Sequence, residues 1–473
     1  MPLLIALCLS SVCCADTEQE TALSPGIYLN DHIIELTTDG STELDLLSVE
    51  NGINIQVVKE DDEQITINGE TVEDALYLDI TSITRDDVIE IEITDDEETI
   101  SHTINLMPAS FGDYTTEGAS VTAGDYYMST YDEETNFIFK LDNLGNLVFY
   151  KKTGDNALDF RKEYNSNGEV RYTYLQYLET SFCGIAGINP GCVVVMDEDY
   201  HVIDELYYQT ADGGETKIDP HGFIYLDDGH YILTAYEDTV VEEIPEELGA
   251  EDNSAYLAVL YIQEIKDGEV LWEFCSQDYP EFFSATTEVT WNSSLESCYD
   301  YVHFNSMYID QDGSLLVSCR NINSILKISR ETGSLIWTLG GTEDDFELTE
   351  DQIFSKQHSI IVTEDGSYMI FNNANDEVAS GAVASSSIIR LKVDENTMEV
   401  IEYLEYETEF YSTYMGAIRE LDGENGIYLW SVGGNYTEVP EYSMIEYSET
   451  DGALFKFRFN EGNRRLYCAN KCE

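Results

Sequence analysis

Three of the seven histidines in this chain occupy matching places in a repeated sequence pattern. His221, His303 and His358 each precede an apolar segment that runs into an Asp-Gly turn. A neutral imidazole is a competent nucleophile, and near neutral pH it also serves as an acid or a base. If the repeats fold into equivalent units, the three imidazoles meet in one place and can carry out group transfer. The alternative is a structural histidine that satisfies a turn carbonyl in each repeat.

An asparagine and an arginine accompany the second of these histidines. Asn305 lies two residues beyond His303, so on a β-strand both side chains are expected on the same side. Arg320 ends the strand predicted to pair with this one, and a guanidinium suits bidentate recognition of an oxyanion. In a chain with only 22 Lys and Arg, it is expected to create a positive well for a sulfate, phosphate or carboxylate group. The alternative is an ion pair with one of the 94 acidic residues.

A cluster of three histidines can instead hold zinc. Arg320 argues against a metal, because a guanidinium and a divalent cation repel each other in one pocket. The sequence also has no Gly-rich phosphate loop, G-x-S-x-G elbow or H-E-x-x-H pair. No metal is therefore expected, and nucleotide hydrolysis, serine esterase chemistry and zincin chemistry are disfavoured.

The elements that must position these residues are short β-strands. From about residue 112, apolar strands flank D/N-x-G turns again and again, as in FKLDNLGNLVFY, IYLDDGHYILTAY and MYIDQDGSLLVSC. Such a step supplies the positive φ of a tight hairpin turn. Two hairpins make one four-stranded blade, so the recurring pairs predict an all-β fold with a six-bladed β-propeller over residues 112–473. A plain stacked β-sandwich is the alternative.

The first part of the chain has a different strand pattern. Residues 25–108 alternate apolar and polar positions in short runs such as INIQVV and VIEIEIT. These runs predict a small N-terminal β-sandwich domain ahead of the propeller. His32 and His102 stand alone in it and are expected to be ordinary surface or strand residues.

The charge and the first residues bear on partners and location. A net charge of −72 repels phosphate backbones and anionic lipid, which disfavours nucleic-acid binding and electrostatic membrane docking. Residues 1–15 are apolar and end in small residues, as in a secretory signal peptide, and no later segment is long enough for a transmembrane helix. The protein is expected to be exported, periplasmic or extracellular. A lipid anchor at Cys13 or Cys14 is the alternative.

Export favours disulfide bonds. Seven cysteines follow the predicted signal peptide, so at least one is left over, and the sequence leaves the connectivity open. The candidate pairs, each closing a short loop, are Cys183/Cys192, Cys275/Cys298 and Cys468/Cys472.

The order of these motifs resembles that of the bacterial arylsulfate sulfotransferases. The motifs are H-G-F before DDGHYIL, H-x-N-S before DGSLLVSCRN, G-x-x-I-W-x-L-GG, and F-x-x-QH, and the resemblance spans about 215–435. It implies an exported, PAPS-independent enzyme with an N-terminal β-sandwich and a six-bladed propeller. Such an enzyme moves a sulfuryl group from an aryl sulfate donor to a phenolic acceptor.

The resemblance also implies roles for individual residues. His358, in the QH motif, matches the nucleophile that forms a sulfohistidine in a ping-pong reaction. The residues that match groups binding the sulfuryl oxygens and stabilising the transition state are His221, His303, Asn305 and Arg320. His221 is favoured over His303 as the acid and base toward the phenolic oxygen. No cofactor is needed, because the aryl sulfate is itself an activated donor.

Two segments and two rival functions stay open. FNNAN at 371–375 departs from the family's F-D-N-G, which leaves the acceptor open, and Ser412 or Thr413 could add a donor to the channel. The rival functions are a non-catalytic propeller that binds an anionic ligand and a sulfatase-like hydrolase that uses the same pocket. A homodimer is an open alternative for the assembly.

Overall fold

The structure is a computed structural model, and it falls into two units. The N-terminal unit contains the described residues up to Thr42 together with Gly52–Asp79 and Val88–Asn105, and the second unit contains the rest. The predicted signal peptide lies outside the described residues. The described ranges are 26–36, 40–59, 63–95, 98–131, 135–179, 181–185, 187–435, 440–460 and 465–473.

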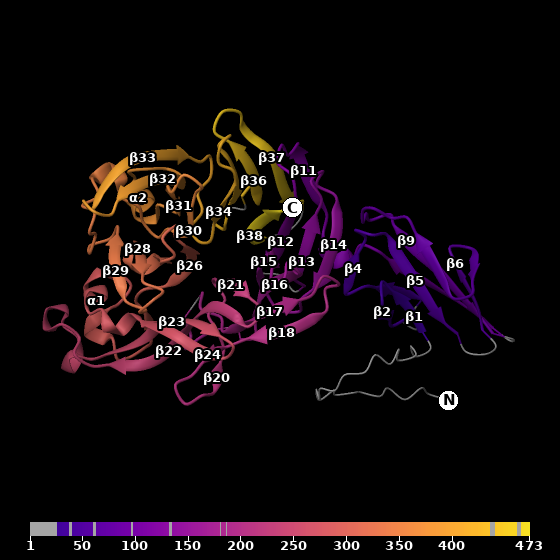
Figure 1. Cartoon of the computed structure of the whole chain (residues 1–473), viewed down its shortest axis with the longest axis horizontal. Helices are drawn as coiled ribbons and strands as arrows, with labels where there is room; N and C mark the ends of the chain where they lie inside the picture. The colour runs from indigo at the N-terminus through magenta and orange to yellow at the C-terminus, as the bar shows by residue number, and fades with distance from the viewer. Residues whose placement is uncertain are drawn as a thin grey trace. The chain divides into compact units, whose positions relative to one another are not determined.

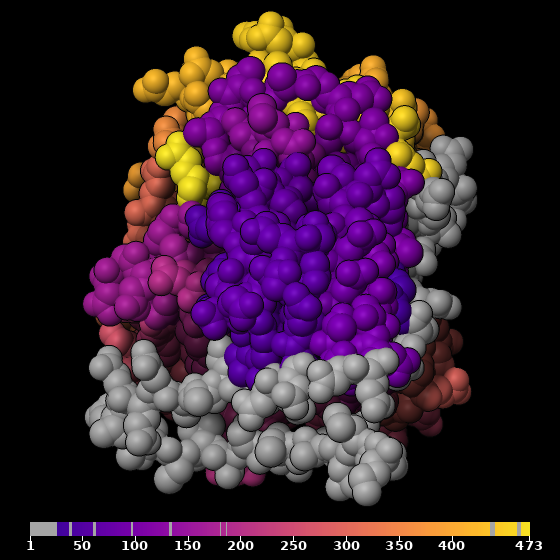
Figure 2. All heavy atoms as spheres, turned by 90° about the vertical axis from the view of Figure 1, so that its right-hand side faces the viewer, coloured from indigo at the N-terminus to yellow at the C-terminus, as the bar shows by residue number. Residues whose placement is uncertain are grey.

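The N-terminal unit consists of two β-sheets. One has the order β2 (His32–Ile34), β1 (Gly26–Leu29), β5 (Ile53–Val58), β8 (Ala75–Leu78). The other has the order β3 (Ser41–Glu43), β10 (Thr99–Asn105), β9 (Val88–Thr94), β6 (Gln64–Ile67), β7 (Glu70–Val72). In β5, Ile53, Ile55 and Val57 are buried while the residues between them are more exposed, as expected for a strand with one face in a core. The atoms of this unit form one continuous surface in Figure 2.

The described residues of the second unit form six larger sheets and one short hairpin, β19 (Tyr208–Gln209) with β20 (Glu215–Thr216). The first three sheets, in strand order, are β38 (Arg465–Cys472), β12 (Asp125–Tyr131), β13 (Phe137–Leu141), β14 (Leu147–Lys152), β4 (Leu46–Ser48); β15 (Ala157–Tyr164), β16 (Val170–Tyr177), β17 (Gly191–Met196), β18 (Val202–Leu206); and β21 (Ile224–Asp227), β22 (His230–Val241), β23 (Ala255–Lys266), β24 (Glu269–Cys275), with β25 (Tyr299–Asp300) on β23.

The other three sheets follow the same hairpin plan. They are β26 (Phe304–Ile309), β27 (Leu315–Cys319), β28 (Ser324–Ile328), β29 (Leu335–Leu339); β30 (His358–Val362), β31 (Tyr368–Asn372), β32 (Ser387–Asp394), β33 (Glu399–Glu407); and β34 (Ala417–Asp422), β35 (Ile427–Ser431), β36 (Met444–Ser448), β37 (Gly452–Phe459), β11 (Tyr114–Gly118). The described α-helices are short, α1 (Glu281–Ala285) and α2 (Asn375–Ser380). The 3₁₀ turns are Ala109–Phe111, Glu246–Leu248, Glu251–Asn253, Ser276–Asp278, Trp291–Ser293, Arg320–Ile322 and Glu350–Gln352. In the described parts of the chain, none of the helices has the length and apolarity that a membrane span requires.

The sheets of the second unit follow one another around a common centre, with one edge strand of each sheet, such as β26, β30 and β34, toward it (Figure 1). Two strand exchanges join the ends of this unit, because β38 pairs with β12 and β11 pairs with β37. Inside this closure, the buried Lys471 ammonium lies 3.0 Å from the Glu446 carboxylate, and the Tyr126 hydroxyl donates to the same carboxylate. The closure therefore depends on strand pairing and on one buried ion pair.

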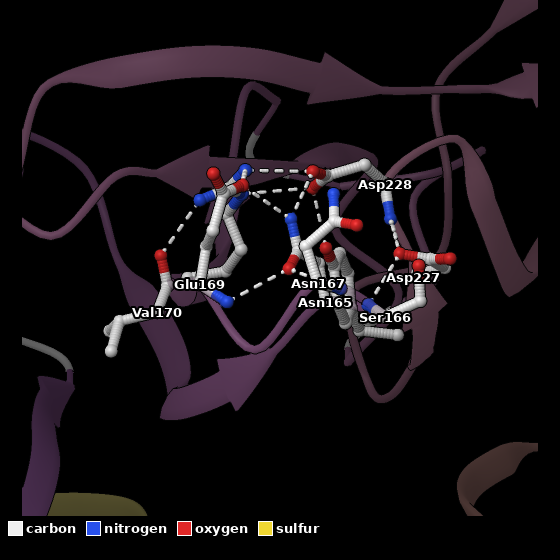
Figure 3. A network of polar contacts seen from close by, with 9 residues as sticks. Asn165, Ser166, Asn167, Glu169, Val170, Asp227 and Asp228 are labelled. Carbon is white, nitrogen blue, oxygen red and sulfur yellow. Dashed lines mark hydrogen bonds and ion pairs between the residues drawn. The ribbon is translucent and has the colours of Figure 1, made fainter.

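The Asp-Gly turns also connect neighbouring sheets. In Figure 3 the turn between β21 and β22 contacts the turn between β15 and β16. Asn165 Nδ2 donates to Asp228 at 2.8 Å, and the Ser166 amide donates to Asp227 at 2.9 Å. The Arg171 guanidinium pairs with Asp228 at 2.7 Å. The repeated turn therefore reverses the chain and also links two adjacent sheets.

The prediction of an all-β fold is confirmed. The six larger sheets of the second unit agree with the predicted propeller, while the blade count and the N-terminal sandwich stay predictions. One detail was not expected, since β4 comes from the early part of the chain but extends the sheet of β14. Sequence alternation does not reveal which sheet a three-residue strand joins.

Candidate active site

Two cavities meet near the common centre of the second unit. The larger, cavity I, has a volume of about 670 Å³ and includes His303, Arg320 and Lys356 in its lining. The smaller, cavity II, has a volume of about 330 Å³ and includes Asn305, Arg161 and Arg419. Both cavities are also lined by His221, His358 and Tyr467. The structure thus brings the three predicted histidines and Arg320 together at cavity I.

Irregular backbone at the start of the inner strands aims these side chains. His303 has a φ of 48° and directly precedes β26, while His358 is the first residue of β30. The register of β30 with β31 shifts just after His358, where Ser359 has a φ of 72°. Such bulges re-aim side chains and are common beside active sites.

His358 is held in one tautomer. Its Nδ1 lies 2.8 Å from the carbonyl oxygen of Gly416, which can only accept, so Nδ1 carries the proton and Nε2 carries the lone pair. Burial, reinforced by the neighbouring positive groups, lowers the pKa of His358 to about 3. This imidazole is therefore neutral at physiological pH with Nε2 available for attack.

His221 has the opposite electrostatics. Its Nδ1 lies 2.8 Å from the Asp219 carboxylate. Burial disfavours the charged imidazole, but the Asp219 carboxylate outweighs it and raises the pKa of His221 above its usual value. With Nδ1 donating to Asp219, a protonated His221 has its Nε2 proton free to donate. The two histidines are thus shifted in opposite directions, as an acid and a nucleophile require.

His303 forms the third corner of the group. Its Nδ1 lies 2.5 Å from an Asp300 carboxylate oxygen, and its backbone amide donates to the other oxygen at 2.8 Å. Its ring meets that of His221 edge to face, with the centroids 5.1 Å apart. Asp300 therefore fixes both the backbone and the ring of His303.

Arg320 lies partly exposed in the lining of cavity I. Its guanidinium donates to the side chain of Asn321 at 3.0 Å, and within the described residues no carboxylate lies within ion-pair distance of it. The predicted alternative of an ion pair is therefore not what the structure shows. The expected positive well also needs correction, because Asp300 and Glu288 line the same cavity and Glu288 pairs with Lys356 at 2.7 Å. Positive charge is concentrated at Arg320 and is not a property of the whole cavity.

Asn305 departs from the expected geometry. It lines cavity II, whereas His303 and Arg320 line cavity I. The strand rule does not apply, because His303 is outside β26 and the register shifts at Asn305. Its Nδ2 donates to the Gln357 carbonyl at 2.6 Å, and its Oδ1 is buried without a partner. Asn305 thus fixes the segment that carries His358.

The departing segment FNNAN and the two candidate hydroxyls contact backbone. Asn373 Nδ2 donates to the carbonyls of Ser412 and Met415 at 2.9 and 3.0 Å. The hydroxyls of Ser412 and Thr413 also donate to backbone carbonyls. These bonds hold the loop that presents the Gly416 carbonyl to His358.

Sequence reasoning missed Asp219, Asp300, Lys356 and Gly416. The first two left a signal, since each lies two or three residues before a predicted histidine. Lys356 is buried and lies two residues before the predicted site residue His358, so its position in the sequence was also a signal. Gly416 directly precedes β34, far from His358 in the sequence, and left no signal.

The three site histidines are not grouped like the ligands of a metal ion in the described residues. Across the described ranges, their ligand atoms do not come together closely enough to share an ion. Among the described residues, one group has ligand atoms close enough to share an ion, and it consists of Asp310, Asp312 and Glu395. The Lys327 ammonium lies among these carboxylates, 2.8 Å from Asp310 and 2.9 Å from Asp312. A lysine thus takes the place that a cation would need.

The fold and site define a β-sheet protein with a central histidine-rich pocket. The family model "Arylsulfotransferase (ASST)" matches residues 179–454, so the chain belongs to the arylsulfotransferase family. This membership supports arylsulfotransferase activity in general, with aryl sulfates and phenols as the substrate classes. No curated protein matches the chain.

Solved structures show a more distant similarity. A protein of unknown function from Bacteroides caccae is 10% identical, with a TM-score of 0.39 over 71% of this chain and 93% of that one. Virginiamycin B lyase from Staphylococcus aureus is 11% identical, with a TM-score of 0.34 over 73% and 98%. A protein of unknown function from Dyadobacter fermentans is 9% identical, with a TM-score of 0.34 over 88% and 100%. At these values the similarity says nothing about function.

Proposed function

We propose that the chain is a PAPS-independent arylsulfate sulfotransferase that works by a ping-pong mechanism through a sulfohistidine at His358. The observation that carries this proposal is the state of His358. Its Nδ1 donates to the Gly416 carbonyl, and its low pKa keeps the imidazole neutral, so Nε2 is a permanently unprotonated nucleophile. Family membership supplies the reaction class.

In the first half-reaction Nε2 of His358 attacks the sulfur of the aryl sulfate. An N–S bond forms, the S–O bond to the aryl group breaks, and the phenolate oxygen takes a proton from Nε2 of His221. The raised pKa of His221 supports this role, because it keeps the acid protonated at a higher pH than an ordinary histidine. The Gly416 carbonyl stabilises the Nδ1–H of the sulfated ring.

The sulfuryl oxygens carry charge throughout and need donors that are already oriented. Arg320 fits this role, since its guanidinium has no carboxylate partner among the described residues. His303, whose Nδ1 donates to Asp300, lies on the same wall and adds a second donor when its Nε2 is also protonated. In the second half-reaction a phenol attacks the sulfur, His221 takes the phenolic proton, and the N–S bond breaks. The reaction requires no cofactor.

The test is direct detection of the intermediate. The protein is mixed briefly with 4-nitrophenyl sulfate without acceptor, quenched in base and digested. Mass spectrometry is expected to find the added sulfuryl mass on the fragment that contains His358. His358→Ala should lose both half-reactions, while His201→Ala, a substitution in an exposed turn, should retain them. Finding the adduct on His221 or His303 would overturn the role assignment, and fast transfer without any adduct would overturn the ping-pong mechanism.

A product assay separates the rival functions. With 4-nitrophenyl sulfate and phenol, a transferase needs phenol for fast release of nitrophenol and makes phenyl sulfate. A hydrolase releases sulfate without phenol, and a binding protein releases nothing. Either of these last two results would replace the proposal.

Export is part of the same proposal and is supported by the apolar residues 1–15 and their small-residue end. N-terminal sequencing of the mature protein is expected to begin after Ala15. A mature protein recovered in the cytoplasm with its first residues intact would contradict export.

A further inference from the structure

Two loops that line cavity I each bring a cysteine to its wall. Cys183 is at the tip of a tight turn, closed by the Ile185 amide donating to the Phe182 carbonyl at 2.8 Å, with φ values of 47° at Cys183 and 77° at Gly184. Cys298 directly precedes β25. The turn makes Cys183 project from its loop, because both central residues have the positive φ of a two-residue hairpin turn.

The two thiols are neighbours in space although 115 positions separate them in the chain. Both thiols line cavity I, and each affects the pKa of the other. Cys183 Sγ also lies 3.8 Å from the Tyr256 hydroxyl, which donates to Asp238. Cys298 directly precedes Tyr299, which pairs with Leu257 next to Tyr256, so both cysteines lie near Tyr256. Neighbouring thiols of this kind are the arrangement from which a disulfide forms.

This neighbour relation differs from the pairs expected from sequence spacing. Cys192 is buried in β17, and Cys275 ends β24, while Cys183 and Cys298 share a cavity wall. All seven cysteines of the described residues carry free thiols in the structure. None of the three pairs predicted from sequence spacing is therefore joined in the described residues.

We propose that Cys183 and Cys298 are a modification site that forms a reversible disulfide across the wall of cavity I by exchange with a disulfide-containing oxidant. The site needs no sulfotransferase activity to form, whereas its effect on catalysis rests on the proposed function. It connects two loops that both contact one residue of the active site.

The chemistry starts at Cys183, which is exposed, whereas Cys298 is half-buried. Its thiolate attacks one sulfur of the oxidant, a mixed disulfide forms, and one thiolate leaves. The Cys298 thiolate then attacks Cys183 Sγ, the Cys183–Cys298 bond forms, and the second oxidant thiolate leaves. Two protein thiols are oxidised and one oxidant disulfide is reduced to two thiols. Burial and the neighbouring Cys183 raise the pKa of Cys298 to about 12, so the second step should accelerate as the pH rises.

The disulfide would act on the site through His303. A Cβ added at Gly187, in the loop of Cys183, would lie 3.4 Å from His303 Cε1. On the other side, Asp300, two residues after Cys298, binds the His303 ring. Joining the loops limits the freedom of both groups that enclose this imidazole. Because small displacements of positioning groups are costly, we expect reduction to lower kcat/KM for sulfuryl transfer on the order of tenfold.

The experiment uses the full-length chain equilibrated in buffers of oxidised and reduced glutathione. Free thiols are alkylated, and the unreduced protein is digested. The oxidised sample is expected to yield one cross-linked pair of fragments, carrying Cys183 and Cys298, that disappears in the reduced sample. Separate alkylation of both residues in the oxidised buffer would overturn the proposal, and so would a cross-link of either residue to Cys192 or Cys275.

Two variants give the matched comparison. Cys183→Ser changes an exposed residue and should remove the cross-link together with the redox dependence of kcat/KM. Cys472→Ser changes a partly buried cysteine that does not line cavity I, and should leave both intact. Redox-independent kcat/KM in an active, cross-linked protein would overturn the effect on His303. A protein that forms the cross-link but transfers no sulfuryl group would instead contradict the proposed function alone.

Discussion

Asp219→Asn should change the pH dependence of catalysis, because this carboxylate contributes most to keeping the buried His221 easy to protonate. The introduced carboxamide would retain an oxygen that can accept from His221 Nδ1, so the hydrogen bond at 2.8 Å can persist while the charge is lost. Burial would then dominate, and it favours the neutral imidazole. The variant therefore removes an electrostatic effect with little change in shape.

The magnitude follows from the lost charge. A hydrogen bond to a charged group contributes about 1.5–3 kcal/mol. Since about 1.4 kcal/mol corresponds to a factor of ten in an equilibrium, the pKa of His221 should fall and its protonated fraction above that pKa should drop about 10–100-fold. In the native protein the acid is protonated below its raised pKa, and activity falls as the pH rises through that value. In the variant the same fall should begin at a lower pH.

The assay is kcat/KM against pH for two donors. Phenyl sulfate has a poor leaving group that needs the proton, whereas 4-nitrophenyl sulfate needs it much less. Asp219→Asn should therefore lower kcat/KM for phenyl sulfate by about 10–100-fold above neutral pH, in proportion to the lost protonated fraction of His221. The value of kcat/KM for 4-nitrophenyl sulfate should fall by less.

Asp300→Asn is the matched control, since it removes the equivalent carboxylate from His303. It should slow the reactions of both donors similarly and move the basic side of the profile less than Asp219→Asn does, because Asp300 raises the pKa of His221 by its charge alone and more weakly than Asp219. If Asp219→Asn leaves the pH profile unchanged, or slows both donors equally, His221 is not the general acid.

Three further substitutions test other parts of the structure. His358→Asn should make the free energy of unfolding depend less on pH in the acid range. The fold lowers the pKa of His358 to about 3, so at acid pH the unfolded chain binds a proton that the native chain does not. In the native protein, stability present above about pH 6.5 is therefore lost as the pH falls. Thermal melts from pH 7 to 4 measure this, and equal slopes for both proteins would contradict it. Arg320→Lys should lower kcat by about 10²–10³, because a point charge does not replace a planar fork, and a loss confined to KM would argue against transition-state binding. Lys471→Met should lower the free energy of unfolding by about 3–5 kcal/mol in denaturant titrations by leaving Glu446 buried and unpaired, and Glu446→Leu in addition should restore much of it.

The strands and hairpins were predictable because their causes are local. Alternation over two residues sets the buried face of a strand, and an Asp-Gly step allows the positive φ of its turn. The same locality placed His221, His303 and His358 at equivalent starts of inner strands, so their convergence could be expected before the structure. Asp219 and Asp300 were within reach of the same reasoning, since each precedes its histidine by two or three residues.

The side on which Asn305 lies could not be predicted from spacing. One residue of positive φ before β26 and one shift of register within it break the alternation that the prediction assumed. The neighbours of Cys183 and Cys298 were equally out of reach, because sequence separation says little about which loops pack together.

The sequence by itself determined the class of the fold, the repeated hairpins, the family motifs and the three histidines, since each is written in residue types over short distances. Only the tertiary structure decided the protonation state of each of those histidines, and with it the role that each can take. The Gly416 carbonyl reaches His358 from just before β34 and sets its tautomer, and burial among positive groups lowers its pKa, whereas Asp219 raises that of His221. Identical imidazoles thus acquire different roles because protonation depends on the surrounding dielectric and charge, and these arise only when distant strands close around a common centre.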